Sequence, residues 1–161
     1  GMSSSYGKAF YKAQEATQVK LPLEGTVLIS VSDRDKGELI EVAKGLYDCG
    51  FKIIATGSTY DRIVEAGMNA VKIAKINEGR PNILDAITNK EIDLILNTPI
   101  GKKGSVDDSY IRKAAIKGKI PYMTTIAAAR ATAKGIHYVQ QHSDSDVKSL
   151  QEIHSMICDK N

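Results

Sequence analysis

Ile53-Ile-Ala-Thr-Gly-Ser-Thr59 is the stretch that decides the fold of this chain. A short apolar run ends here in three hydroxyl side chains and a glycine, and apolar residues at helical spacing follow it. A strand that passes directly into a helix places backbone N–H groups and hydroxyls at the positive end of the helix dipole, where anions bind. The stretch therefore predicts a strand with a small anion site at its end, and a phosphorylated small molecule as the ligand.

The same alternation of strand and helix repeats along the chain. Apolar runs typical of strands occupy 26–31, 51–55, 70–73, 92–96 and 120–123. Such alternation predicts parallel strands joined by right-handed crossovers, with helices on both faces of the sheet. The expected fold is α/β, a doubly wound and mainly parallel five-stranded sheet with Rossmann-type layering.

Capping residues predict where several helices begin. Asp35 with Glu38 is expected to form a capping box, and Ser58 to cap the helix after the second strand. Asp107 or Asp108 is expected to cap the helix that precedes the fifth strand.

Toward the C-terminus, a helix over 126–134 is expected to end at Gly135. A last short strand near 138–139 and a final helix from 144–145 are expected to follow.

Composition limits the class of protein. The 161 residues, 42% hydrophobic and 25% charged, fit one compact domain, which we place at 25–161. Residues 1–24 are interpreted as an expression scar, a short helix and a linker from a preceding domain.

Charge and cysteine content limit the partners and the compartment. The net charge is +3, and the lysines and arginines are scattered among acidic residues, which disfavours nucleic acid as a partner. Two cysteines without C-x-x-C spacing, no secretory segment and no apolar run of 18 residues predict a cytoplasmic protein with no membrane contact.

Four of the predicted strand ends carry polar side chains, and ligands of such sheets bind at the carboxyl ends of the strands. Two lysines with several hydroxyls suit a monophosphate, and an asparagine offers both a donor and an acceptor to a base or a ribose. The plainer interpretation, that each Ser or Thr is only a cap or turn residue, remains open for any single one of them. The polar ends comprise Ser30, Ser32, Asp33, Asp35 and Lys36; Thr56, Ser58 and Thr59; Lys75, Asn77, Glu78 and Arg80; and Asn97, Thr98, Lys102 and Lys103.

Other kinds of site find little support. Neither G-x-x-x-x-G-K-[ST] nor G-x-G-x-x-G occurs, which disfavours an ATP or NAD site. His137, His142 and His154 lack the spacing of metal ligands, so no metal is expected. The pair Asp107-Asp108 could supply a general base beside a phosphate, although helix capping is the favoured interpretation.

Longer segments resemble a known family. Ile29-Ser-Val-Ser-Asp-Arg-Asp-Lys36, the Gly50–Thr59 segment and Tyr110-Ile-Arg-Lys-Ala-Ala115 are similar to the methylglyoxal-synthase-like family. Glu78-Gly-Arg-Pro81 and the strand end at Asn97-Thr98 resemble, more narrowly, the C-terminal allosteric domain of carbamoyl phosphate synthase large subunits, as does Gln151-Glu-Ile-His154. The resemblance implies a regulatory domain that binds a nucleoside monophosphate, with UMP as inhibitor and IMP as activator.

The resemblance also implies which residues contact the effector. It implies no catalytic residue and no cofactor in this domain. Pro99 stands where the family has a hydroxyl, which removes a donor on the base side. The implied phosphate contacts are Ser30, Lys36, Thr56, Thr59 and Lys75, and the implied base and ribose contacts are Asn97, Thr98 and Asp108.

The parent protein implied by the resemblance is an ATP-dependent ligase. It makes carbamoyl phosphate from bicarbonate, glutamine-derived ammonia and ATP, for pyrimidine and arginine synthesis. Its synthetase domains use Mg or Mn and K ions, and a glutaminase small subunit joins them. Relatives also use this domain for oligomer contacts, so a homo-oligomer is a further expectation.

Two sister activities provide the alternatives. Methylglyoxal synthase, a lyase that acts on a triose phosphate, needs a catalytic aspartate in a Gly-Gly-Asp turn after the third strand. This chain has Glu78-Gly79-Arg80 there, and a guanidinium cannot replace a catalytic carboxylate base. The Thr-Leu-His-Pro-Lys signature of the inosinate cyclohydrolase domain is absent. A stand-alone lyase and an oligomerisation module remain the alternatives to a regulatory domain.

Overall fold

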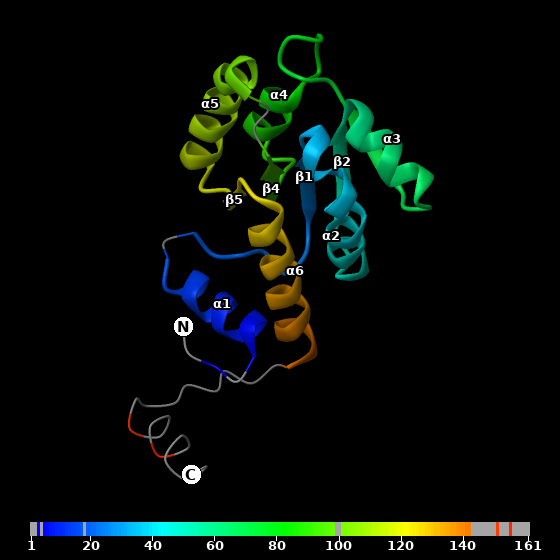
Figure 1. Cartoon of the computed structure of the whole chain (residues 1–161). Helices are drawn as coiled ribbons and strands as arrows, with labels where there is room; N and C mark the ends of the chain where they lie inside the picture. The colour runs from blue at the N-terminus through cyan, green and yellow to red at the C-terminus, as the bar shows by residue number, and fades with distance from the viewer. Residues whose placement is uncertain are drawn as a thin grey trace.

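A five-stranded parallel sheet forms the centre of the molecule (Figure 1). The computed structural model describes residues 3, 5–17, 19–98, 101–142, 151 and 155, with side chains left out over 101–106. The strands lie in the order β3-β2-β1-β4-β5 and every pairing is parallel, which confirms the predicted fold class. The strands are β1 Thr26–Ser30, β2 Lys52–Thr56, β3 Ala70–Ile73, β4 Leu94–Asn97 and β5 Tyr122–Met123.

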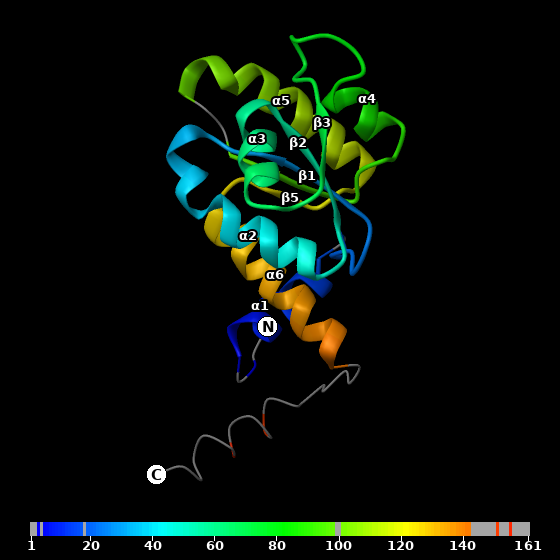
Figure 2. The same cartoon turned by 90° about the vertical axis from the view of Figure 1, so that its right-hand side faces the viewer.

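Helices cover both faces of this sheet (Figure 2). One face packs on α2, α3 and α6, and the other on α4 and α5. Successive β1 side chains alternate between the two cores, with Val27 and Ile29 in the first and Leu28 in the second, as the two-residue period of a strand requires. The helices are α1 Tyr6–Glu15, α2 Lys36–Asp48 after a 3₁₀ turn Asp33–Asp35, α3 Gly57–Glu65, α4 Ile83–Thr88, α5 Gly101–Gly118 and α6 Ile126–Gln141.

The strand order reverses direction between β1 and β4. The chain passes from β1 outward to β3, then returns to β4 on the other side of β1. Loops on either side of such a switch point diverge and leave a crevice at the carboxyl ends of the strands. This edge brings together predicted polar residues from the ends of β1, β2 and β4, namely Ser30, Thr56 and Asn97.

The N-terminal helix α1 packs on α6, outside the layer that α6 forms against the sheet (Figure 2). The two backbones touch at a pair of glycines, because a Cβ on Gly7 would lie 3.0 Å from the Lys134 carbonyl oxygen and one on Gly135 would lie 3.1 Å from the Gly7 oxygen. The short helix predicted within 3–24 is therefore confirmed, while the domain boundary at residue 25 stays a prediction.

This contact explains a wrong prediction. Gly135 does not end a helix, and residues 138–139 do not form a strand, because α6 continues to Gln141. The glycine lies buried within α6 so that α1 can approach. The predicted final helix lies outside the described residues, apart from 151 and 155.

Two predicted caps are wrong, at α3 and α5, and the one predicted for α2 is right in position only. α3 begins at Gly57, with Thr56 rather than Ser58 at the N-cap. Asp35 occupies the N-cap position of α2 but makes no capping hydrogen bond, because its carboxylate accepts from the Ser32 hydroxyl instead. Asp107 and Asp108 lie inside α5, which begins at Gly101. Within the described part of the chain, a capping box forms at α4, where it joins Asn82 and Asp85.

Candidate functional site

The middle of the site is the end of β1, at the switch point. Ser30 pairs with Asn97 of β4 in the sheet register, and the Thr98 N–H donates to the Ser30 carbonyl oxygen at 3.0 Å. On the other side, the Thr56 hydroxyl of β2 donates to Ser30 Oγ at 2.9 Å. The structure thus places three predicted contact residues, Thr56, Ser30 and Asn97, on adjacent strands of one sheet edge.

Two predicted lysines converge on the first turn of α3. Lys36, at the start of α2, donates from Nζ to Ser58 Oγ at 2.7 Å. Lys75, which follows β3, crosses the same turn, since a Cβ built on Gly57 would lie 4.0 Å from its Cε. Thr56 makes no capping hydrogen bond to α3, so its side chain leaves the N-terminal N–H groups of the helix to other acceptors. Two ammonium groups and a helix N-terminus together form a cradle for an anion.

A carboxylate of the chain lies beside this cradle. Asp33 forms an ion pair with Lys36 and is exposed to solvent. The hydrogen bond from Lys36, together with the charges of Lys36 and Lys75, lowers the pKa of Asp33. The Asp33 carboxylate therefore lies in the electrostatic field of both lysines, as a ligand phosphate would, although Asp33 was not among the predicted effector contacts.

Two other predicted contacts hold the loop after β1. The Val31 N–H donates to Thr59 Oγ1 at 3.3 Å, and the Ser32 N–H donates to Thr98 Oγ1 at 2.8 Å. Thr59 and Thr98 are both buried, with 2% of each residue exposed. Their hydroxyls fix the backbone of the loop between β1 and α2, which carries Lys36 into the site.

A network of four side chains lies on the β4 side of the site. Asn97 Nδ2 donates to Asp108 Oδ1 at 2.9 Å and to the Tyr122 hydroxyl oxygen at 2.7 Å. Tyr122 in turn donates to Asp108 Oδ1, and Arg112 donates to Asp108 Oδ2 at 3.2 Å. Burial, with smaller contributions from its neighbours, raises the pKa of Tyr122 to about 12. The predicted pair of Asn97 and Asp108 is thus joined by Tyr122 and Arg112, which sequence reasoning missed.

The segment that spans most of this site matches a family model. Residues 38–124 match the MGS-like domain. The chain belongs to the MGS-like domain family. This match covers β2 to β5, and therefore the site residues Thr56, Lys75, Asn97 and Tyr122.

Relatives of this MGS-like domain extend the similarity to nearly the whole chain. The carbamoyl phosphate synthase large chain of Archaeoglobus fulgidus is 46% identical over 155 residues, 96% of this chain but 14% of the relative. That of Nostoc sp. is 43% identical over 152 residues, 94% of this chain and 14% of the relative. The C-terminal section of the large chain from Aquifex aeolicus is 41% identical over 160 residues, 97% of this chain and 30% of the relative. The chain thus spans less than a third of the length of these relatives.

A solved structure has the same fold. Methylglyoxal synthase from Elizabethkingia anophelis superposes with a TM-score of 0.56, at 20% identity, over 70% of this chain and 79% of that one. The superposition shows that the sheet and helices of the two proteins have the same arrangement.

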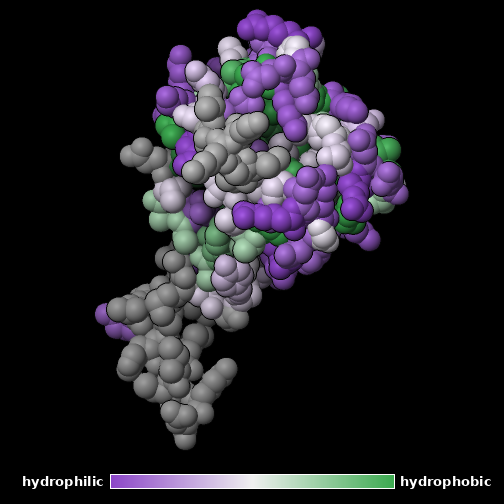
Figure 3. All heavy atoms as spheres, turned by 45° about the horizontal axis from the view of Figure 1, so that its top comes forward, coloured by the Kyte–Doolittle hydropathy of each residue, from purple (hydrophilic) through white to green (hydrophobic). Residues whose placement is uncertain are grey.

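Seen from the end where the strands finish, the MGS-like domain presents a largely hydrophilic face (Figure 3). Asn77, after β3, donates to both carboxylate oxygens of Asp107 on α5, at 3.0 and 3.1 Å. Glu78 accepts from the Lys75 backbone N–H at 3.0 Å. The two bonds from Asn77 hold the loop after β3 beside α5, and the bond to Glu78 closes a turn within the loop.

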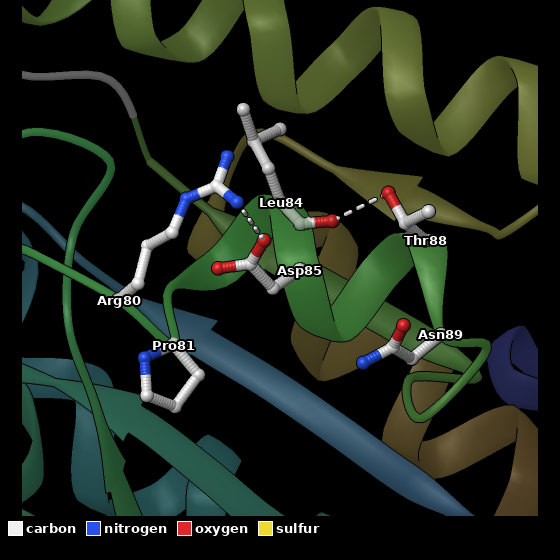
Figure 4. Close-up of a pocket in the computed structure, with 6 residues that line it drawn as sticks. All are labelled: Arg80, Pro81, Leu84, Asp85, Thr88 and Asn89. Atoms are coloured by element: carbon white, nitrogen blue, oxygen red, sulfur yellow. Dashed lines mark hydrogen bonds and ion pairs between the residues drawn. The ribbon is translucent and has the colours of Figure 1, made fainter.

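Arg80, in the turn after β3, lies at the surface of the molecule. Its side chain is 83% exposed and forms an ion pair with Asp85 at 3.6 Å (Figure 4). It lines a shallow depression beside α4, and none of the lining residues is a predicted contact. The lining residues are Arg80, Pro81, Leu84, Asp85, Thr88 and Asn89.

The described residues form neither a metal site nor a membrane-spanning helix. No group of three or more His, Cys, Asp or Glu side chains there could hold a metal ion. None of the helices in that part of the chain is both long and apolar enough to cross a membrane. Pro99 and the side chains of Lys102 and Lys103 lie outside the described part.

Proposed function

We propose that this chain is the effector-binding module of a carbamoyl phosphate synthase large chain and that it binds a nucleoside monophosphate. UMP acts as the inhibitor and IMP as the activator. The observation that carries the proposal is the convergence of Lys36 and Lys75, from two separate strand ends, on the first turn of α3. Two point charges and a helix N-terminus match a phosphate dianion better than they match a neutral ligand.

Hydrogen-bonding side chains for the base and the ribose of a mononucleotide lie across the switch point from the phosphate cradle. Ser30 connects the cradle to Asn97, because it accepts from Thr56 and pairs with Asn97 in the sheet. Asn97 and Asp108 supply an amide and a carboxylate, which suit a base edge and a ribose hydroxyl. The site thus offers a charged end and a hydrogen-bonding end on adjacent strands.

The domain acts as a sensor rather than as a catalyst. The turn after β3 carries Arg80 instead of a carboxylate base, and the Arg80 guanidinium pairs with Asp85 at the surface. Binding of the effector changes the activity of the synthetase domains of the same polypeptide. Those domains make carbamoyl phosphate from bicarbonate, ammonia and ATP, and they use Mg or Mn and K ions. A glutaminase subunit supplies the ammonia. A coupling of this kind amounts to roughly 1 to 3 kcal/mol between two sites, so it is measured in the whole enzyme.

Calorimetry on this chain tests the proposal directly. UMP and IMP should each bind with one site per chain, and N-acetylglutamate, which carries no phosphate, should not bind. An absence of heat with both nucleotides at millimolar concentration would refute the proposal. Formation of methylglyoxal from dihydroxyacetone phosphate would instead support the lyase alternative, and concentration-dependent self-association without nucleotide binding would support an oligomerisation module.

A further inference from the structure

Lys75 reaches the phosphate cradle from a loop rather than from a strand. β3 ends at Ile73, and a single bridge between Ala74 and Asn82 follows it. After this bridge the chain forms a loop that stands out from the molecule before α4 begins (Figure 2). The backbone of Lys75 therefore lies beyond the end of its strand, and the direction of its side chain depends on how this loop is held.

Residues 75–78 form a turn that is closed by two hydrogen bonds. The Glu78 N–H donates to the Lys75 carbonyl oxygen at 3.0 Å, and the Glu78 carboxylate accepts from the Lys75 N–H, also at 3.0 Å. Ile76 packs from this turn against the core between the sheet, α4 and α5. Because the two ends of the turn are bonded to each other, a tether on any one of its residues also limits the position of Lys75.

Asp107 on α5 provides such a tether. The amide nitrogen of Asn77, the third residue of the turn, lies 3.0 and 3.1 Å from the two carboxylate oxygens of Asp107. Asn77 is exposed and Asp107 is half-buried, so the contact joins a surface loop to the body of the domain. The acceptor is a carboxylate, and hydrogen bonds to ionised groups are stronger than those between neutral groups.

α5 is a suitable anchor because it is itself fixed to the sheet. Ile111 and Ala115 are buried in the core that α5 shares with the sheet, with 4% and 0% of each residue exposed. The neighbouring carboxylate, Asp108, accepts from Asn97 Nδ2 of β4 at 2.9 Å. Two consecutive acidic residues thus connect α5 to both sides of the site, Asp108 to the end of β4 and Asp107 to the loop after β3.

We propose that Asp107 is a positioning residue for phosphate binding: through Asn77 it holds the turn that places Lys75 across the first turn of α3. The inference rests on the proposed function. A lysine whose backbone is already fixed has less conformational freedom to lose when a phosphate binds. Asp107 is itself negative and repels a phosphate, so a positioning role and a purely electrostatic role predict opposite effects when its carboxylate is removed.

Asp107→Ala and Asn77→Ala test the proposal by calorimetry with UMP and with inorganic phosphate. Each substitution should weaken binding of both ligands by about three- to tenfold, the effect of losing one hydrogen bond to a charged group. The double variant should lose no more affinity than either single variant, because both remove the same contact. Tighter or unchanged binding in a folded Asp107→Ala variant would overturn the proposal.

Two further comparisons separate positioning from a general loss of structure. In a Lys75→Ala background, Asp107→Ala should change the affinity for UMP by less than about twofold, because Asp107 acts through that lysine. A merely structural role would weaken binding equally with and without Lys75, and that result would refute the proposal.

The second comparison exchanges the two side chains of the tether. Asn77→Asp alone should weaken binding, because two carboxylates would then face each other. Combining Asn77→Asp with Asp107→Asn restores one amide, one carboxylate and the original net charge, so the affinity should return to within about twofold of the wild type. An exchange variant that binds no better than Asn77→Asp would count against the tether.

Glu91→Ala is the matched control. Glu91 also accepts from an exposed asparagine, Asn89, at 3.2 Å, but it lies before β4, at the opposite end of the strands from the cradle. Its removal should change the affinity for UMP by less than about twofold. A loss equal to that in Asp107→Ala would show that any surface carboxylate has this effect, which contradicts the proposal.

Failure of this inference and failure of the proposed function are distinguishable. Wild-type binding of UMP with no loss in Asn77→Ala would refute the inference and leave the proposed function standing. No binding of UMP or of inorganic phosphate by the wild type would refute both. Thermal unfolding checks that each variant folds, and if Asp107→Ala does not, Asn77→Ala decides, because Asn77 is exposed.

Discussion

Replacing Lys75 by alanine should weaken nucleotide binding by about 10- to 100-fold. The lysine crosses the first turn of α3, with Cε 4.0 Å from the position of a Cβ on Gly57, so its ammonium group faces the phosphate cradle. A charge-assisted hydrogen bond to a phosphate is worth roughly 1.5 to 3 kcal/mol, and each 1.4 kcal/mol is a tenfold change in affinity. Calorimetric titration with UMP measures the change directly.

Lys72→Ala is the control for this prediction. Lys72 lies on β3 near Lys75, its side chain is 58% exposed, and it pairs with Asp61 at 3.6 Å. Removing this remote charge should change the affinity by less than about twofold, because salt screens charges on the surface. Equal losses in Lys72→Ala and Lys75→Ala would show that only net charge matters, and no loss in a folded Lys75→Ala would refute the cradle.

Three further predictions concern the cradle, the loop after β1 and the contact between α1 and α6. Asp33→Asn should tighten binding of inorganic phosphate by about two- to fivefold, because Asp33 competes for Lys36; unchanged or weaker binding by calorimetry would contradict this. Hydrogen bonds from Ser32, and to a smaller extent from Thr98, lower the pKa of Asp35 in the folded protein. The ionised carboxylate therefore stabilises the fold at pH values above its pKa in the unfolded chain, about 3.9, and this stabilisation is lost as the pH falls through its lower pKa in the folded protein. Denaturant titrations should therefore show a shallower loss of stability at acid pH in Asp35→Asn, and an unaltered slope would count against these bonds. Gly135→Ala should lower the free energy of unfolding, because the added methyl group overpacks the contact with α1 at a cost of about 1 to 3 kcal/mol. The higher helix propensity of alanine offsets about 1 kcal/mol of this cost. An increase in melting temperature would contradict the close contact with α1.

The fold could be predicted from the sequence because its signals are local. Buried parallel strands form uninterrupted apolar runs, as in Leu94, Ile95 and Leu96, which are all fully buried. Gly135 misled the prediction because its cause is not local. A glycine in a helical pattern normally marks the end of a helix, whereas this one makes room for a backbone 128 residues earlier in the chain, at Gly7.

The site was predicted in outline for a similar reason. Lysines and hydroxyls directly after apolar runs indicate the strand ends, and a parallel sheet brings those ends together. Asp108 was interpreted as a cap because the start of α5 at Gly101 left no clear signal. Tyr122 was missed because an aromatic residue in a short apolar strand usually belongs to the core, and only the fold shows its hydroxyl between Asn97 and Asp108.

A crystal structure of this chain with UMP tests the central claim most directly. The account predicts the phosphate between the ammonium groups of Lys36 and Lys75, against the first turn of α3, with the base directed toward Asn97 on the far side of Ser30. A phosphate bound elsewhere, such as in the depression beside Arg80 and Asn89, with the cradle occupied only by Asp33, would contradict it.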